Sequence, residues 1–314
     1  MSDVARDLLI VAVALLTSAV GSIGGLGGAI LLVPLLSLGD MTIAQAAPLG
    51  LVSVIAGSVA AGRGQARDGT VNHRFGVVTE IGATLGALVG VLLAGAVPER
   101  GLSYGLAVLA IAAAAGGAAR RGVRWKKDPT LTLGDVGERH GSLDGAYRLD
   151  DGVVPYSPSR MPLGVALMTL SGIVTGLAGV GGGFLKTPLS SEVMRLPAKV
   201  AAATSTFTIG LTASTALALM AMDGRVVAQD AALVVLGAVV GGTVGARLQR
   251  RVSPPVVRRA TSVVLVVIAV LLAVAGATAA QFGRADAVAG RLMAAYVAWL
   301  AYASTLSAGV FAMN

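Results

Sequence analysis

Two glycine clusters and one lysine are the residues whose types and spacing best suit anion binding. Residues 24–36 read GGLGGAILLVPLL and residues 178–190 read AGVGGGFLKTPLS. Bunched glycines let the backbone turn, and a helix starting after them presents free N–H groups and the positive end of its dipole. Two such helix starts facing a cavity would hold an anion. The candidate substrate-binding residues are Gly25, Gly27, Gly28, Gly181, Gly182, Gly183, Lys186, Thr204, Ser205 and Thr206.

Lys186 and a run of hydroxyl residues supply the side chains of this candidate site. A lysine in hydrocarbon costs about 3 kcal/mol, so it should face a polar cavity or a partner such as an anionic substrate. The alternative is that it snorkels to the membrane surface. Thr204, Ser205 and Thr206 offer neutral donors to an oxyanion, although hydroxyls in membrane helices also bond to their own backbone. Glu80 is expected to snorkel, with the transfer of coupling protons as the alternative.

The segments that must position these residues are apolar and long enough to cross a membrane. Of the 314 residues, 55% are hydrophobic and 13% are charged, against about 25% charged residues in an average soluble domain. A helix of about 20 apolar residues spans the hydrocarbon core of a bilayer. The composition therefore predicts an all-α polytopic membrane protein. Nine apolar segments are expected, at residues 8–38, 43–62, 75–97, 101–118, 162–190, 198–221, 228–246, 256–281 and 288–312.

An internal repeat organises these segments into two duplicated halves. A shift of 154 residues superimposes the glycine and proline motif at 25–35 on residues 179–189, and a shift of 155 superimposes residues 68–90 on 223–245. Glycines spaced by four in both halves indicate close helix packing, at Gly82, Gly86, Gly90, Gly237, Gly241 and Gly245. The predicted regions are a first transmembrane repeat at 1–118, a polar cytoplasmic linker at 119–161, a second transmembrane repeat at 162–281 and a C-terminal transmembrane helix at 282–314.

The distribution of lysine and arginine predicts how the halves are oriented. Nine single crossings would place the five arginines of the loop 247–259 outside, against the rule that short cytoplasmic loops are positively charged. If each glycine segment instead re-enters one face, three crossings remain in each half and the halves are inverted. The cytoplasmic side then holds 18 Lys and Arg residues and the outside holds five. The charges favour inverted halves, each with a broken or re-entrant segment plus three helices. Pro34 and Pro188 fit a kink or the first turn of the returning arm.

Residues 119–161 form the only long polar segment of the chain. The run AYRLDDGVVPYS at 146–157 is typical of a small hairpin, because Asp151 and Gly152 favour the positive φ angles of a tight turn. A disordered linker is the alternative. The chain has no cysteine, and its two histidines, His73 and His140, fall in polar loops, so neither a metal nor a cofactor is expected.

The glycine motifs and a later hydroxyl run resemble a known family. GVGGGFLKTPLS, its counterpart in the first half and KVAAATSTF at 199–207 are similar to sequences of the sulfite exporter TauE/SafE family, also called the toluene sulfonate uptake permeases. The resemblance covers about residues 8–281. It implies the movement of small sulfur-containing anions such as sulfite, sulfonates and sulfoacetate. The first half reads QAAPLGLVSV where the second reads KVAAATSTF, which argues against a strictly symmetric site.

The expected function is secondary transport of small sulfur-containing anions by a multi-pass protein of the cytoplasmic membrane. An anion channel with re-entrant, glycine-rich filter loops is the alternative. The apolar segments contain no paired acids, histidine-bearing metal motif or activated nucleophile, so no enzyme activity is predicted. The expected partners are the anion, the lipid bilayer and a proton or another coupling ion. Nucleic acid is not expected, because the basic residues lie between apolar segments as topology signals.

Overall fold

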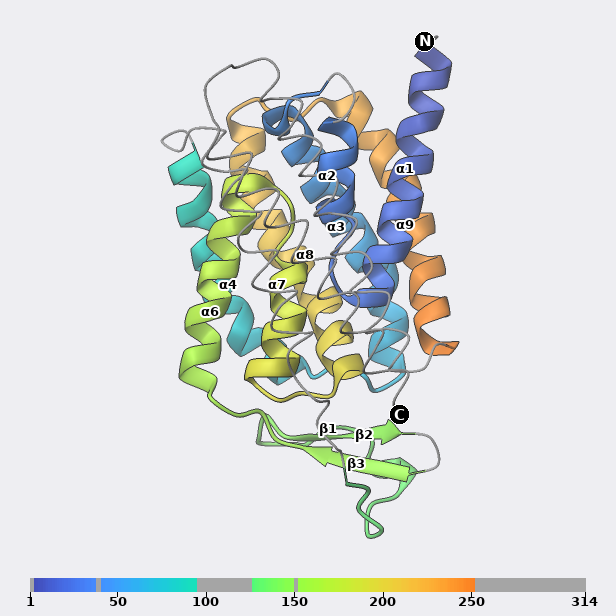
Figure 1. The fold of residues 1–314 in the computed structure, drawn as a ribbon, viewed down its shortest axis with the longest axis vertical. Helices are drawn as coiled ribbons and strands as arrows, with labels where there is room; N and C mark the ends of the chain where they lie inside the picture. The colour runs from blue at the N-terminus through green and yellow to red at the C-terminus, as the bar shows by residue number, and fades with distance from the viewer. Residues whose placement is uncertain (1–2, 38–40, 95–125, 150–151, 252–314) are drawn as a thin grey trace, which may run out of the picture.

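The computed structural model describes residues 3–37, 41–94, 126–149 and 152–251, which are mainly helical (Figure 1). Six of the described helices are long and apolar enough to cross a membrane. This confirms the prediction of a mostly helical, polytopic membrane protein. The expected segments 101–118, 256–281 and 288–312 lie outside the described residues. The division into two repeats, a linker and a C-terminal helix stays a prediction.

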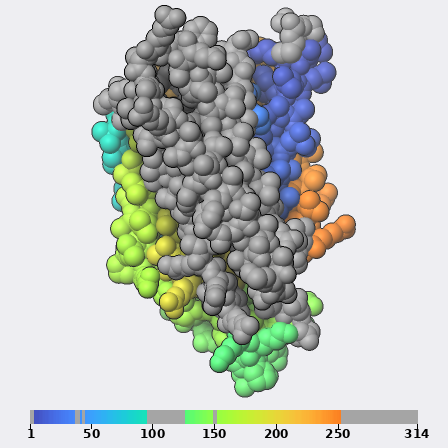
Figure 2. All heavy atoms as spheres, in the orientation of Figure 1, coloured from blue at the N-terminus to red at the C-terminus, as the bar shows by residue number. Residues whose placement is uncertain are grey.

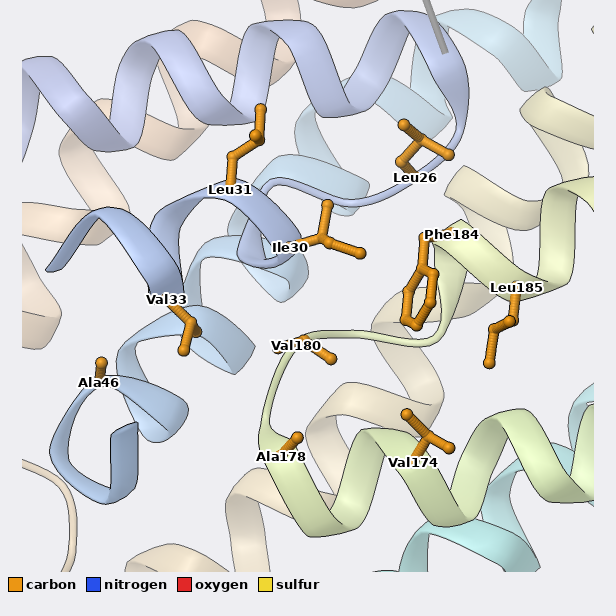
Figure 3. Packing of buried hydrophobic residues seen from close by; sticks show 10 residues of the cluster. All are labelled: Leu26, Ile30, Leu31, Val33, Ala46, Val174, Ala178, Val180, Phe184 and Leu185. Carbon is orange, nitrogen blue, oxygen red and sulfur yellow. The ribbon is translucent and has the colours of Figure 1, made fainter. Parts of the chain in front are cut away.

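The first glycine cluster separates a long helix from a short one. α1 spans Asp3–Gly24, and after the break at residues 25–28 α2 spans Ala29–Ser37. The chain doubles back at this break (Figures 1 and 3). α3 spans Ile43–Arg67 and starts at a capping box, in which the backbone N–H of Thr42 donates to the Gln45 side chain and the Gln45 N–H donates to the Thr42 hydroxyl. α4 spans His73–Ala94.

The second glycine cluster makes the same kind of break. α6 spans Met161–Ala178, residues 179–182 form the break, and α7 spans Gly183–Pro188. A π-helical turn, η2 at Leu189–Val193, leads to α8 at Ala198–Met222 and α9 at Ala228–Arg251. The expected segments 8–38 and 162–190 are therefore each a helix, a break and a short helix.

The two prolines after the breaks do not lie in the first turn of the short helices, which was one of the two places that the sequence allowed. Pro34 is the sixth residue of α2, and Pro188 is the sixth residue of α7. A place in the first turn is therefore wrong for both. At Pro188 the α-helix gives way to the π-helical turn η2, which fits the other alternative, a local change of helix geometry.

Positive backbone φ angles at matching positions explain why each break needs glycine. Gly25 and Gly27 have φ of 67° and 77°, and their repeat counterparts Gly179 and Gly181 have φ of 64° and 67°. Residues with a Cβ rarely adopt this left-handed region because the Cβ approaches the following carbonyl oxygen. The similarity of the clusters thus corresponds to a similarity of backbone conformation.

Glycine stripes hold two helix pairs in close contact. α9 lies along α1, and α4 lies along α6, at opposite edges of the molecule in Figure 2. A Cβ at Gly86 would collide with the backbone of Thr169, and one at Gly241 would collide with the backbone of Leu15. The predicted packing role of the glycine stripes is therefore confirmed.

A small antiparallel sheet lies at one end of the helices (Figure 1). A 3-10 turn, η1 at Leu133–Asp135, precedes β1 at Gly137–Glu138, β2 at Gly145–Leu149 and β3 at Gly152–Tyr156, in the order β1-β2-β3. Gly145 pairs with Tyr156 and Leu149 pairs with Gly152, so the predicted hairpin is confirmed. Gly152 is the first residue of β3 and does not have a positive φ, so the turn conformation predicted for it is wrong. A disordered linker is wrong for these residues. β1 was not predicted, because two residues are too short to show an alternating pattern.

The sheet is attached to the helices by tyrosines and by Asn72. Tyr147 and Tyr156 pack in an apolar cluster with Phe75, which lies at the start of α4. The Asn72 amide nitrogen donates to the Leu143 carbonyl at 2.8 Å and to the Tyr156 hydroxyl at 3.2 Å. Burial raises the pKa of Tyr156 above its ordinary value, so the phenol is neutral where it docks.

Candidate functional site

Lys186 is the fourth residue of α7, the short helix that begins directly after the second glycine break. Its backbone N–H donates to the Gly182 carbonyl at 2.9 Å. The neighbouring Phe184 and Leu185 pack against residues of both breaks, including Leu26 and Val180 (Figure 3). Lys186 itself is only 3% exposed. The interpretation that it snorkels to the surface is therefore wrong.

The partner of Lys186 is a carboxylate on another helix. The ammonium nitrogen lies 2.7 Å from Oε2 of Glu80, on α4, and Glu80 is also 3% exposed. The prediction that Glu80 snorkels is wrong, because its carboxylate is held inside the protein by a cation and by further donors. A buried charge needs both a counter-ion and hydrogen bonds, and here each member of the pair provides them for the other.

Thr212 of α8 completes the arrangement. Its hydroxyl accepts a hydrogen bond from the Lys186 ammonium at 2.8 Å and donates to Oε1 of Glu80. Its backbone N–H donates to the same carboxylate oxygen at 3.0 Å. We call these three residues the Lys186–Glu80–Thr212 cluster. It joins α4 of the first half to α7 and α8 of the second half.

Glu80 and Thr212 are members of this cluster that sequence reasoning did not place in the site. One feature of the sequence could have indicated that Glu80 belongs to the site. Glu80 and Lys186 are opposite charges within apolar segments, and such charges tend to pair. Thr212 carries no comparable signal. Several other threonines and serines lie in the same segment, and only the helix arrangement selects one of them.

The three predicted hydroxyl residues have different partners. Thr204 accepts a hydrogen bond from the backbone N–H of Asn72 at 3.0 Å, and Thr206 donates to the carbonyl of Ala202 in its own helix at 2.9 Å. Ser205 donates to the Gly25 carbonyl at 3.0 Å. The structure thus brings Ser205 to a glycine break, while Thr206 follows the self-bonding alternative. Substrate contacts of all three stay a prediction.

The Gly25 carbonyl is a point of contact between the halves. It accepts hydrogen bonds from Thr187 at 2.7 Å and from Ser205 at 3.0 Å, both in the second half. A shift of 154 residues relates Thr187 to Val33, and a shift of 155 residues relates Ser205 to Gly50, and neither counterpart carries a hydroxyl. The shift of 155 fits the contacts of the breaks, because Gly25 approaches Ala202 and Gly179 approaches Ala47. The second break therefore has no equivalent pair of donors from the first half, and the centre of the molecule is asymmetric in its chemistry.

The two glycine breaks lie against each other at the centre of the molecule (Figure 3). A Cβ built on Gly27 would lie 3.2 Å from both Val54 and Ile209, and one built on Gly181 would lie 2.8 Å from Val54. Val54 and Ile209 are themselves repeat counterparts on α3 and α8. Apolar side chains therefore line the space between the breaks in this structure. Anion binding by Gly25, Gly27, Gly28, Gly181, Gly182 and Gly183 stays a prediction.

A cavity of about 390 Å³ opens at the end of the molecule where α1 starts. Polar residues in its lining are Arg6, Gln45, Arg225 and Asp230. One guanidinium nitrogen of Arg6 lies 3.0 Å from each carboxylate oxygen of Asp230, which ties α1 to the start of α9. A second cavity, of about 220 Å³, lies at the opposite end, beside the sheet.

The similarity of this chain to known proteins covers both glycine breaks and the Lys186–Glu80 pair. A family model described as sulfite exporter TauE/SafE matches residues 10–272. The chain belongs to this family. The matched range includes both glycine breaks and the Lys186–Glu80–Thr212 cluster, and it confirms the resemblance drawn from the glycine motifs. TauE/SafE proteins are membrane transporters, so this protein is a membrane transporter of that family.

A relative of this TauE/SafE protein is also named as a membrane transporter. The chain is 26% identical over 272 residues to the "Probable membrane transporter protein YunE" of Bacillus subtilis (strain 168). The similarity covers 83% of this chain and 95% of the relative. No solved structure matches the chain.

Proposed function

We propose that this protein is a secondary transporter that moves small sulfur-containing anions, such as sulfite and sulfonates, across the cytoplasmic membrane. The observation that carries the proposal is Lys186, a buried cation beside the central glycine breaks whose partner is a carboxylate. A carboxylate and a sulfite or sulfonate group present similar charged oxygens to an ammonium. An anionic substrate can therefore compete with Glu80 for the same donors.

Replacement of Glu80 by a substrate anion as the partner of Lys186 would change the charge balance of the buried site. When a monoanion takes the place of Glu80, the ammonium and the anion neutralise each other and the Glu80 carboxylate loses its counter-ion. A carboxylate buried without a counter-ion favours its protonated form. Binding of one monoanion is thus linked to uptake of one proton by Glu80, which makes the proton the coupling ion of this proposal.

The proposed transport cycle uses inverted halves with re-entrant breaks. Three observations support this architecture: the matching positive φ angles of the two breaks, the reversal of the chain at each, and the approach of α1 and α6 to the centre from opposite ends (Figure 1). Transporters with interrupted helices in inverted repeats alternate access to a central site by moving one part against the other. Cavities at both ends of the described helices are suited to admit water and solute from each side.

Counterflow into proteoliposomes tests this function. Vesicles loaded with unlabelled sulfite should accumulate labelled sulfite transiently, and excess sulfite or a small sulfonate outside should suppress the uptake in a saturable way. Sulfate and chloride serve as comparison anions. Single-channel currents without counterflow would contradict a carrier and support the anion-channel alternative.

A further inference from the structure

The start of α2 is a buried helix end with N–H groups that lack acceptors among the described residues. Gly28 directly precedes the helix, and its carbonyl accepts hydrogen bonds from the N–H groups of Leu31 and Leu32 at 3.2 and 3.0 Å. The N–H groups of Gly28, Ala29 and Ile30 make no hydrogen bond to any described residue. All three residues are buried. The first N–H groups of a helix have no partner inside it, so a buried helix start needs acceptors from elsewhere.

A buried serine lies beside this helix start. Ser53, on α3, is 0% exposed, and its hydroxyl has no hydrogen-bond partner in the described part of the chain. A Cβ built on Gly28 would lie 3.0 Å from the Ser53 hydroxyl oxygen. Ser58 of the same helix instead donates to the Ile55 carbonyl at 2.9 Å. Buried polar atoms are almost always satisfied, so the Ser53 hydroxyl calls for a bound group as its partner.

The first glycine break therefore has an apolar side and a polar side. A Cβ on Gly27 would meet Val54 in the space between the two breaks. Gly28 instead faces α1 and α3, where its nearest neighbours are Ser18 and Ser53. The unpartnered groups on this polar side are backbone N–H groups and a hydroxyl, which can all donate hydrogen bonds. Together with the positive end of the helix dipole, they suit a negatively charged acceptor.

The hydroxyls beside the second glycine break are already used within the protein. Those closest to Gly182, the repeat counterpart of Gly28, belong to Ser171 and Thr175. Ser171 donates to the Gly182 carbonyl and Thr175 donates to the Ser171 carbonyl, both at 3.0 Å. The unpartnered hydroxyl thus lies at the first break, in keeping with the chemical asymmetry of the two halves.

We propose that the N–H groups at the start of α2 and the Ser53 hydroxyl form a binding site for an oxyanion group, the α2 site, and that the transported anion occupies it on its way to or from Lys186. The passage of the transported anion rests on the proposed function. The donors of the α2 site bind the charged oxygens that sulfite, sulfonates and sulfate share. Ser53 is fully buried in this structure, so an anion reaches the site when the first break opens.

Calorimetric titration of the purified full-length variant Lys186→Met/Glu80→Met with sulfite tests the α2 site. Sulfite bound by this variant lies away from the Lys186–Glu80–Thr212 cluster. Adding Ser53→Ala should weaken that binding by about tenfold, as expected for the loss of one hydrogen bond to a charged group. Without anion, Ser53→Ala should not lower the free energy of unfolding, because the hydroxyl it removes has no partner in the described structure.

Ser58→Ala is the matched control, because it removes a hydrogen-bonded hydroxyl from the same helix. It should lower the free energy of unfolding and leave sulfite binding unchanged. In wild-type background, Ser53→Ala should raise the half-saturation concentration for sulfite counterflow, whereas Ser58→Ala should not. This second measurement applies even if the Lys186→Met/Glu80→Met variant fails to fold.

Titration with sulfate separates the α2 site from the identity of the substrate. Sulfate binding that depends on Ser53, in a protein without sulfite counterflow, would support the site and contradict the proposed function. Sulfite counterflow with the same half-saturation in wild type and Ser53→Ala would overturn the α2 site and leave the proposed function standing. Displacement of sulfite by an equal concentration of chloride would also overturn it, because the site would then not be selective for an oxyanion.

Discussion

The ammonium nitrogen of Lys186 lies 2.7 Å from a carboxylate oxygen of Glu80, although the two residues are 106 positions apart on helices of different halves. Both side chains are almost fully buried. Removing one partner of such a pair leaves an uncompensated charge and typically costs about 3–5 kcal/mol, whereas replacing both with apolar residues is often neutral. The pair therefore affects the interpretation of any substitution at Lys186.

Lys186→Met should lower the free energy of unfolding by about 3–5 kcal/mol, because it leaves the Glu80 carboxylate without its cation. The double variant Lys186→Met/Glu80→Met should recover most of that loss. Chemical unfolding in mixed detergent micelles measures both. Equal destabilisation of the single and double variants would show that the two residues do not act as a pair.

Gly25→Ala and Gly179→Ala should destabilise the protein strongly, since a Cβ would meet the backbone of Ala202 in one case and of Ala47 in the other. Gly224→Ala is the matched control. Gly224 has a similar φ of 69° and open space around it, so alanine there should cost only the conformational strain of about 1–2 kcal/mol. Thermal unfolding compares the three. Similar losses at all three positions would contradict the close approach at the breaks.

Thr187→Val and Ser205→Ala should each cost about 1 kcal/mol, because the Gly25 carbonyl keeps one donor in either variant. The double variant should cost more than the sum, since the buried carbonyl then has neither. A double-mutant cycle of unfolding free energies measures the difference. Strict additivity would argue that the two hydroxyls do not share this acceptor.

Asp68 and Asp223 are repeat counterparts that follow α3 and α8, and inverted halves place them on opposite sides of the membrane. Cysteine can be introduced at each position singly, because the chain has none. An impermeant maleimide should label Asp223→Cys in intact cells and should label Asp68→Cys only after permeabilisation. Labelling of both from outside would contradict inverted halves.

The helix breaks could be predicted from the sequence because their cause is local. Bunched glycines, as at Gly25 and Gly27, mark backbone that must adopt positive φ, and the repeat doubles the signal. The hairpin at β2 and β3 was predictable because two β-prone runs lie close together in the sequence, although Gly152 belongs to β3 and does not adopt the positive φ expected of it. In both cases neighbouring residues determine the conformation.

The pairing of Lys186 with Glu80 could not be predicted in the same way, because it depends on how α4 packs against α7 and α8. Sequence position suggested that Glu80 reaches a nearby basic loop, whereas the helix packing turns it inward. The docking of the sheet through Asn72 and Tyr156 likewise joins residues 84 positions apart. Such contacts follow from tertiary arrangement rather than from any local pattern.

The proposed exchange of Glu80 for a substrate anion on Lys186 is tested most directly by sulfite binding to Glu80→Gln. This variant keeps the cation and removes its competitor, so calorimetry at mildly acidic pH should show sulfite binding at least about tenfold tighter than in wild type, a difference of about 1.4 kcal/mol. The proton uptake that accompanies binding to wild type should disappear. Lys186→Met/Glu80→Met should show no sulfite binding at the central site. Unchanged affinity in Glu80→Gln, with unchanged proton uptake, would contradict the account.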